Sequence, residues 1–303
     1  MYYFIINPRS RSNRGLAIWK ELEAYLKDNK INYQYMLTEF PGHATELASK
    51  WSTDFTAKAI IILGGDGTIN EVINGISDFK SIPLAYIPTG SSNDFARSMK
   101  LPAKPIDCLK RILNYPAETF LDVGMVTGED TQRYFMVSSG IGFDASVCKE
   151  AMNSRAKNIL NRIGLGKITY FAIALKQLIC TRRACGSIRI DEHSFDLKRL
   201  VFASAQNHPF EGGGFKFCPN AKPDDGILNF IFADDMSKWK VLCALPFAMR
   251  GTHDRFKGIH IGSCNSFELN LNRKMPVHVD GEYCGDYSHV TFQLCKERIR
   301  LLL

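Results

Sequence analysis

The sequence contains no long hydrophobic run. Its apolar stretches are short: Ala59–Leu63 has the length of one strand, and Ile168–Cys180 is interrupted by Lys176 and Gln177. A helix that crosses a bilayer needs about 20 mainly apolar residues, so we expect none. The first residues, Met1–Ile6, also lack the basic leader of a secretory signal. We therefore expect a cytoplasmic protein.

Cysteine patterns that would indicate disulfides or zinc are also missing. The chain has nine cysteines, but no two have the spacing Cys-x-x-Cys. The closest pair, Cys180 and Cys185, is separated by four residues. An odd number of scattered cysteines in a cytosolic chain is typical of reduced, mostly buried thiols. A disulfide framework is therefore not expected.

Acidic residues are scarce in one segment of the chain. Between Cys148 and Ser187 there are eight basic residues and one acid, Glu150, so this segment alone accounts for the net charge of +7. Apolar residues such as Ile159 and Leu160 lie between the charges, a pattern typical of contact with an anionic membrane. A helix with a solvated basic face explains the charge equally well. No nucleic-acid-binding motif accompanies it, so nucleic acid is not an expected partner. The basic residues are Lys149, Arg155, Lys157, Arg162, Lys167, Lys176, Arg182 and Arg183.

The length of 303 residues exceeds the usual size of one domain and favours two. Over residues 1–120, short apolar runs, polar loops and helix-period stretches alternate. This alternation implies a parallel sheet with ligand-binding loops at its carboxyl edge. We predict a three-layer α/β nucleotide-binding domain over residues 1–120. Its predicted strands are Tyr2–Ile6, Tyr33–Leu37, Ala57–Leu63 and Leu84–Ile87.

After Asn114-Tyr115-Pro116 the rhythm changes to strand-like runs separated by turn signals. Two helical stretches interrupt them, near Ser154–Thr181 and Ser237–Arg250. We predict a mostly antiparallel β-sandwich domain with helical insertions over residues 121–303, and we leave open that its last residues pack against the first domain. The predicted strands are Leu121–Val126, Tyr134–Ser138, Ser187–Ile190, Arg199–Ala205, Ile227–Phe232, Ser266–Leu271 and Val277–Val279.

A glycine turn, Gly64-Gly65-Asp66-Gly67-Thr68, follows the buried strand directly. Thr68 and Glu71 have the spacing of a capping box, so a helix is expected to begin here. Glycines let the backbone approach a phosphate, and a helix N-terminus favours an anion. Asp66 would repel a phosphate unless a cation or a proton lies between them, and magnesium would resolve this conflict. A purely structural turn would need the glycines but not Asp66.

A second loop, Pro88–Asp94, follows the next predicted strand. In a parallel sheet it should lie near the glycine turn, to which it adds hydroxyl groups, amides and the carboxylate of Asp94. Asn and Asp are also common helix caps. On the residues alone, Asp94 is therefore as compatible with a cap as with catalysis.

Together these features resemble the diacylglycerol kinase catalytic family, in particular its soluble bacterial lipid kinases. The Gly-Gly-Asp-Gly-Thr turn alone is shared with NAD kinases, but the ordered set of motifs is specific and covers almost the whole chain. The set comprises Asn7-Pro8, Thr38, Gly42-His43-Ala44, Gly64–Thr68, Asn70-Glu71, Pro88–Arg97, Gly140–Asp144, Gly212–Gly214, Ala221–Gly226 and Asp280–Glu282.

The resemblance implies ATP in the cleft between the two domains. In this chain Ser91 stands where the family usually has Thr, and the loop after Asn7 lacks the glycine that often follows Ser10. Arg9 or Arg11 could add charge to that loop. The residues that the resemblance assigns to ATP are Asn7, Pro8, Arg9, Ser10, Arg11, Thr38, Gly64, Gly65, Asp66, Gly67, Thr68, Asn70, Glu71 and Ser91.

The resemblance also implies catalytic roles for Glu282, Asp66 and Asp94. Glu282 matches the family's base, which takes the proton of the lipid hydroxyl as the phosphoryl group is transferred. Asp66 is the alternative base. Without the resemblance, Asp280-Gly281 before Glu282 reads first as a hairpin turn.

A magnesium site away from the reaction centre is implied as well. The carboxylate of Asp225 would bind the ion together with the main-chain carbonyls of Lys222 and Ile227, and such hard oxygen ligands suit magnesium. The alternative is an ordinary Asp-Gly turn before the next strand. The histidines His43, His208, His253 and His278 have no metal-ligand spacing and are expected to be structural.

We therefore expect a magnesium-dependent lipid kinase that transfers the γ-phosphate of ATP to a lipid hydroxyl. Diacylglycerol and related lipid alcohols all offer a hydroxyl beside an apolar tail. A kinase of a soluble metabolite such as NAD is the alternative enzyme, and a non-catalytic lipid- or nucleotide-binding regulator is the alternative from another class. The expected partners are the lipid substrate and an anionic membrane, with peripheral contact at the inner membrane face. A homodimer is left open.

Overall fold

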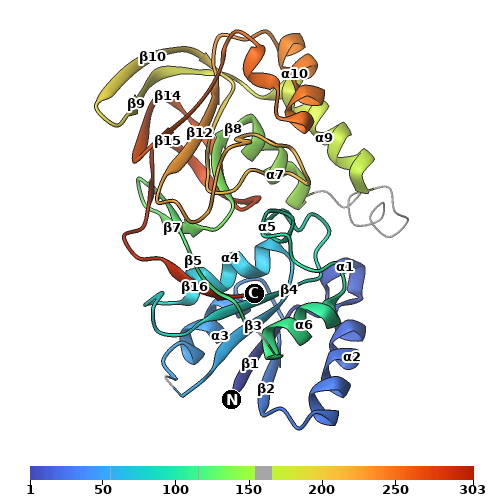
Figure 1. Cartoon of the computed structure of the whole chain (residues 1–303). Helices are drawn as coiled ribbons and strands as arrows, with labels where there is room; N and C mark the ends of the chain where they lie inside the picture. Colours follow the sequence, from blue (N-terminus) through green and yellow to red (C-terminus); the bar gives the residue numbers. More distant parts are fainter. Residues whose placement is uncertain (55, 115, 154–165) are drawn as a thin grey trace. The chain divides into compact units, whose positions relative to one another are not determined.

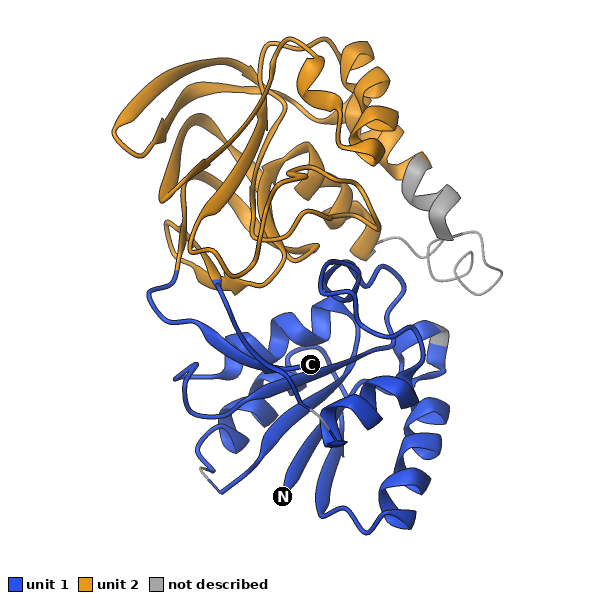
Figure 2. Ribbon diagram, in the orientation of Figure 1, with its two compact units in different colours: residues 1–123, 295–303 blue, residues 124–294 orange. Residues whose placement is uncertain are grey.

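The computed structural model describes residues 1–54, 56–114, 116–153 and 166–303. The chain forms two compact units, coloured separately in Figure 2. Unit 1 comprises Met1–Val123 and Cys295–Leu303, and unit 2 comprises Gly124–Leu294. The end of the chain thus belongs to the same unit as its beginning. Each unit has its own sheet and its own core.

Unit 1 is built on a six-stranded sheet in the order β2-β1-β3-β4-β16-β5. Neighbouring strands are parallel from β2 to β16, and only the edge strand β5 runs antiparallel. The predicted parallel sheet is confirmed. The strands are β1 (Tyr2–Ile6), β2 (Tyr33–Leu37), β3 (Ala59–Gly64), β4 (Leu84–Pro88), β5 (Glu118–Leu121) and β16 (Ile299–Leu302).

Helices pack against the sheet of unit 1 (Figure 1). On one side, Trp19 and Leu22 of α2 and Leu109 of α6 join one apolar cluster with alternating residues of β1, β3 and β4. Tyr3 of β1 points to the opposite face, where its ring stacks on Trp51 of α3 with centroids 4.7 Å apart. The helices are α1 (Ser10–Asn13), α2 (Gly15–Asp28), α3 (His43–Trp51), α4 (Asp66–Gly75), α5 (Asp94–Ser98) and α6 (Pro105–Asn114).

Unit 2 is a ten-stranded sheet in which every strand pairing is antiparallel. The main path runs β13-β12-β11-β8-β14-β15-β6-β7, and β9 joins it through β14 and also pairs with β10. The predicted antiparallel domain is confirmed. The strands are β6 (Gly124–Gly128), β7 (Gln132–Phe135), β8 (Ser138–Gly142), β9 (Ala184–Ile190), β10 (His193–Leu200), β11 (Phe202–Gln206), β12 (Leu228–Ala233), β13 (Ile259–Cys264), β14 (Ser266–Val279) and β15 (Glu282–Leu294).

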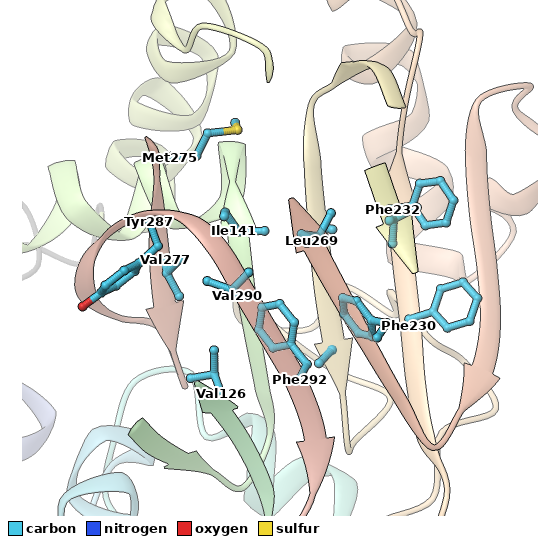
Figure 3. Packing of buried hydrophobic residues seen from close by; sticks show 14 of the residues in the cluster. Val126, Ile141, Phe230, Phe232, Leu269, Met275, Val277, Tyr287, Val290 and Phe292 are labelled. Atoms are coloured by element: carbon cyan, nitrogen blue, oxygen red, sulfur yellow. The ribbon is translucent and has the colours of Figure 1, made fainter. Parts of the chain in front are cut away.

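The long strand β14 changes partner along its length. Phe267–Leu271 pairs with β9, whereas Val277–Val279 pairs with β8, and the register against β15 shifts between these two parts. One strand therefore pairs with two parts of the sheet, and residues from both parts of β14 join one apolar cluster. Val290 and Phe292 of β15 lie in this core, beside residues from β6, β8, β12 and β14 (Figure 3).

The helices of unit 2 are α7 (Phe143–Asn153), α9 (Gly166–Cys180), α10 (Lys238–Arg250) and the 3₁₀ helix η1 (His253–Arg255). The helix predicted near Ser237–Arg250 is confirmed as α10. It begins where Ser237 Oγ accepts the amide of Lys240 at 3.2 Å, and it ends at Gly251 in the left-handed conformation. Of the stretch predicted near Ser154–Thr181, α9 forms the second half, and residues 154–165 lie outside the described residues.

Three predicted strands were wrong in their limits. Leu121–Val126, Tyr134–Ser138 and Arg199–Ala205 each contain the end of one strand and the start of the next. The chain turns at Val123, at Met136-Val137 and at Val201, and all of these residues are buried. Because hydrophobicity does not drop at these turns, the sequence shows no break. Conversely, the two predicted strands Ser266–Leu271 and Val277–Val279 are parts of the single strand β14.

Across the part of the chain that the structure describes, no helix is both long enough and apolar enough to cross a membrane.

Candidate active site

The glycine turn connects β3 to α4 without a loop. β3 ends at Gly64 and α4 begins at Asp66, so Gly65 alone forms the N-cap. The amides of Thr68 and Ile69 both donate to the carbonyl of Gly65, at 2.9 and 3.3 Å. A Cβ atom on Gly64 would lie 2.4 Å from Thr68 Oγ1, so a larger residue cannot occupy this position without displacing the helix start.

The predicted capping box at Thr68 and Glu71 is wrong. The helix begins two residues before Thr68, which therefore lies inside its first turn, and no side chain caps this end. The carboxylate of Glu71 instead accepts the amide of Ala44, at the start of α3, at 3.1 Å. Thr45 Oγ1 donates to the Glu71 carbonyl at 2.9 Å. Glu71 therefore fixes α3 against α4.

The second loop packs directly on the glycine turn. The amide of Thr89 donates to the Gly64 carbonyl at 2.7 Å. A Cβ atom on Gly90 would lie 2.7 Å from the Cα atom of Gly65, so glycine at position 90 permits this contact. The two loops that the sequence predicts to be neighbours are in contact within unit 1.

The carboxylate of Asp66 joins the two loops. Its Oδ2 accepts the amide of Asp94 at 3.0 Å, and its Oδ1 accepts the amide of Phe95 at 3.4 Å. These are the first two amides of α5, where a helix favours negative charge. From the sequence alone, the charge of Asp66 has no partner other than the predicted magnesium ion. In the structure two amides stabilise that charge.

Asp94 is not the cap of α5. The capping position belongs to Asn93, which is in the left-handed conformation and donates from Nδ2 to the Gly90 carbonyl at 3.1 Å. Asp94 is the first residue of the helix, is 4% exposed, and forms an ion pair with Arg97. Ser91 in the same loop is exposed. Within this loop, the side chain of Asp94 is therefore buried, whereas Ser91 is open to solvent.

The loop after β1 is tied to both of these loops. Asn7 Nδ2 donates to Thr68 Oγ1 at 3.3 Å, and the Asn7 Oδ1 atom accepts the amide of Arg9 at 3.0 Å. The buried hydroxyls of Ser10 and Thr89 lie 2.8 Å apart. Three loops after β1, β3 and β4 are therefore joined by side-chain hydrogen bonds.

Sequence reasoning missed the glycine of the first loop. A Cβ atom on Gly15 would lie 2.2 Å from the Asn7 carbonyl oxygen and 2.6 Å from Ser10 Oγ. This close approach needs glycine, although it comes after the four-residue helix α1 rather than next to Ser10. Thr38 follows β2, and its amide donates to the carbonyl of Ile6 at 2.8 Å. The structure thus brings Thr38 and the loops after β1, β3 and β4 to one edge of the sheet.

In unit 2, Asp280 and Gly281 form the predicted hairpin turn between β14 and β15. Both have positive φ, and Val279 pairs with Glu282 across the turn. The carboxylate of Asp280 accepts the three consecutive amides of residues 136–138, at 2.9, 2.8 and 3.0 Å. Glu282, the first residue of β15, is half-buried. The hydrogen bonds of Asp280 therefore fix the backbone position of Glu282.

The predicted metal residues lie in one exposed loop of unit 2. Asp225 Oδ1 accepts the amide of Ile227 at 3.1 Å, which is the bond expected of an ordinary Asp-Gly turn. This bond uses one of the two carboxylate oxygens of Asp225. The side chains of Lys222, Asp225 and Ile227 are all exposed. A carboxylate oxygen and two carbonyl oxygens form a donor set that suits magnesium.

A group of three titratable side chains in unit 2 was missed. Asp144, Glu211 and His278 present ligand-type atoms within 4.8 Å of one another. Each lies beside a motif of the sequence: Asp144 ends Gly140–Asp144, Glu211 precedes Gly212–Gly214, and His278 lies two residues before Asp280. This position beside a motif is the feature of the sequence that could have indicated the three residues. His278 by itself was expected to be structural.

The comparisons with known proteins agree with this arrangement. Residues 1–126 match the model of the diacylglycerol kinase catalytic domain, and residues 136–302 match that of the YegS C-terminal NAD kinase beta sandwich-like domain. A Bacillus subtilis protein with lipid kinase in its name, YtlR, is 32% identical over 94% of both chains. The diacylglycerol kinase of the same organism is 28% identical over 98% of this chain and 97% of its own length.

A solved structure shows the same fold. A diacylglycerol kinase from Bacillus anthracis superposes with a TM-score of 0.70 over 99% of this chain and 96% of its own, at 18% identity. The chain belongs to the diacylglycerol kinase family and is a lipid kinase. Kinases of this family use ATP.

The Asp280 carboxylate gives a prediction for unit 2. Asp280→Ala removes the acceptor of three amides and should destabilise this unit by about 3 kcal/mol, since hydrogen bonds to a charged group are the stronger ones. Hydrogen exchange of the amides at 136–138 should become faster. Asp286→Ala is the control, because it removes a half-exposed partner of Lys149. Equal exchange at 136–138 in both variants would contradict the assignment.

Proposed function

We propose that this lipid kinase transfers the γ-phosphate of ATP to the hydroxyl of diacylglycerol or a related lipid alcohol, with magnesium. The observation that carries the proposal is the joining of the glycine turn to the second loop through Asp66. Phosphoryl transfer depends mainly on positioning and charge stabilisation. A fixed group of glycine amides, hydroxyls and one carboxylate at a helix start can supply both.

In this proposal the phosphates bind at Gly64–Thr68, because the N-terminus of α4 favours an anion. Asn7 and Ser10 hold the first loop in place through Thr68 and Thr89. Ser91 is exposed and can offer its hydroxyl to the nucleotide. Thr38 follows β2 at the same edge of the sheet.

We assign the role of base to Glu282 rather than to Asp66. Both oxygens of Asp66 already accept backbone amides, so its lone pairs are less available to accept a proton. Glu282 is half-buried and follows a turn that is fixed by Asp280. A carboxylate held in this way can take the proton of the lipid hydroxyl as the phosphoryl group is transferred. Asp66 then acts on the charge and position of the phosphates.

Magnesium has two proposed places. At the phosphates it would neutralise charge near Asp66 and Asp94. In unit 2 it would bind the free oxygen of Asp225 together with the carbonyls of Lys222 and Ile227. The second site lies on the loop before β12 and would stabilise that loop.

Contact with an anionic membrane is proposed from the basic segment at 148–187. Arg155, Lys157 and Arg162 lie outside the described residues. Among the described residues of this segment, Lys149 forms an ion pair with Asp286, and Lys176 forms one with Glu150. Arg182 is exposed and can meet an anionic surface directly. Such a contact would bring the kinase to a lipid substrate that is embedded in the membrane.

The proposal predicts lipid phosphorylation from labelled ATP over a panel of lipid alcohols, with NAD as the competing acceptor. Asp66→Asn should lose nearly all of this activity while the fold is kept, because an amide carries no charge to balance magnesium. Its Oδ1 can still accept one amide of α5. Transfer to NAD but to no lipid would overturn the proposal, and near-normal turnover by Asp66→Asn would remove Asp66 from it.

The same panel, presented in mixed micelles and in anionic vesicles at low and high salt, separates chemistry from membrane contact. Salt screens charges that are more than about 10 Å apart. A rate that falls with salt only on vesicles supports the membrane contact. Equal salt dependence in micelles and vesicles counts against it.

For the metal of unit 2, Asp225→Ala should lower the melting temperature in magnesium, because a ligand that binds only the native state stabilises it. A chelator should lower the melting temperature of the wild type and leave that of Asp225→Ala unchanged. Asp224→Ala is the matched control on the neighbouring exposed carboxylate. A wild-type melting temperature that does not respond to magnesium would contradict this site.

A further inference from the structure

Unit 2 contains a buried histidine between two carboxylates. His278 Nε2 lies 3.3 Å from Asp144 Oδ2 and 3.4 Å from Glu211 Oε1, and the three side chains are 0%, 9% and 11% exposed. His278 is on β14, Asp144 on α7, and Glu211 lies just before the triglycine loop. A Cβ atom on Gly140, which pairs with His278, would lie 2.1 Å from Asp144 Oδ2. Glycine there leaves room for the group.

Further side chains form hydrogen bonds around Glu211. Its second oxygen, Oε2, accepts Gln206 Nε2, and the same amide donates to Ser204 Oγ at 2.9 Å. Ser139 Oγ donates to the main-chain carbonyl of His278 at 2.6 Å. These hydrogen bonds join Glu211, Gln206 and Ser204 in one buried network, which restricts the orientation of the Glu211 carboxylate.

The second ring nitrogen of His278 faces the hairpin turn. His278 Nδ1 accepts the amide of Gly281 at 3.2 Å. A nitrogen that accepts an N–H bond carries no proton, so the proton of the neutral ring is on Nε2, between the two carboxylates. A metal ion on Nε2 would require the opposite tautomer, with Nδ1 protonated against the Gly281 amide. The geometry therefore fits a hydrogen-bonded group rather than a metal site.

The protons of the group are shared. Burial raises the pKa of Asp144. Burial lowers the pKa of His278, but Cys148, Asp144 and Glu211 raise it well above its usual value as long as they are ionised. A proton on Asp144 removes one of these charges and so favours the neutral ring. Asp144 and His278 thus compete for one added proton. A proton on Asp144 leaves the hydrogen bond from the Gly281 amide to His278 Nδ1 intact. A proton on Nδ1 would remove the acceptor of this bond. The bond at 3.2 Å corresponds to the first arrangement.

We propose that His278 is a positioning residue for Glu282. It holds the turn at Gly281 from one side while Asp280 holds it at the amides of 136–138 from the other. The inference rests on the proposed role of Glu282 as the base. Glu211 extends the same network to Gly212–Gly214, so that one buried group fixes two loops of unit 2.

Two variants of His278 separate the contacts of its two nitrogens. The side-chain oxygen of Asn occupies roughly the place of Nδ1 and can accept the Gly281 amide, whereas the amide of Gln reaches roughly the place of Nε2 and keeps only the carboxylate side. His278→Gln should therefore lower kcat by about 10- to 100-fold, since misplacing a catalytic group by about 1 Å costs on that order. The KM for ATP should change by less than about twofold, because ATP binds residues of unit 1. His278→Asn should restore most of kcat.

The control is His253→Gln, which alters another buried histidine of unit 2 whose Nε2 lies 3.2 Å from the Phe217 carbonyl oxygen. Its kcat should equal that of the wild type. Melting temperatures of all variants are measured first, and kinetics are run well below the lowest of them. Equal kcat in His278→Gln and the wild type would overturn the inference. So would an equal loss of kcat in His278→Asn and His278→Gln.

Glu282→Gln distinguishes this inference from the proposed function. If Glu282→Gln is inactive while His278→Gln keeps its kcat, only the positioning role fails. If Glu282→Gln is as active as the wild type, the proposed base is wrong, and the inference fails with it.

Nitrogen NMR of ¹⁵N-histidine-labelled wild-type protein needs no variant. The inference expects the His278 ring to be protonated on Nε2 and free of a proton on Nδ1. A proton on Nδ1 would overturn it. Loss of the Nε2 proton on addition of zinc, which is diamagnetic, would also overturn it, because it would indicate a metal ion bound to Nε2 in place of the hydrogen-bonded group.

Discussion

The carboxylate of Asp66 is the link on which the carboxyl edge of the parallel sheet depends. It lies at the start of one helix and accepts the first amides of another, so that α4 and α5 are oriented together. The contact between Gly65 and Gly90 needs glycine at position 90, where a Cβ atom would lie 2.7 Å from the Cα atom of Gly65. The charge of Asp66 thus has a structural use, which is to bind a helix N-terminus. In the proposed function the same charge also acts on the phosphates.

Unit 2 uses its carboxylates in a similar way. Asp280 accepts three consecutive amides, and the pair Asp144 and Glu211 holds one face of His278. In each case a buried or half-buried carboxyl group fixes a loop or a buried side chain rather than binding an exposed charge. Exposed ion pairs such as Arg199 with Asp235 add little by comparison. The positions of the proposed catalytic residues therefore follow from backbone amides bound by carboxylates, in both units.

Much of the fold could be predicted from the sequence, but the networks of the site could not. β1 and β2 were predicted to the residue, because each is an apolar or aromatic run between polar loops. The predicted strand limits were wrong where the residues between two strands, such as Val123, are themselves buried. Glu71 has the spacing of a cap, yet its partner is the amide of Ala44, which no local pattern indicates. Asp144, Glu211 and His278 come from distant parts of the chain, so only the folded sheet brings them together.

The central claim is that the glycine turn and the second loop act as one phosphate-binding unit because Asp66 joins them. Hydrogen exchange of the wild type and of Asp66→Asn, each with and without ATP and magnesium, measures this directly. The account predicts that nucleotide slows exchange at Gly64–Ile69 and at Asp94–Phe95 together in the wild type. In Asp66→Asn the slowing at Asp94–Phe95 should be lost even when the nucleotide is saturating. Slowing at neither segment in the wild type, or unchanged slowing at both in Asp66→Asn, would contradict the claim.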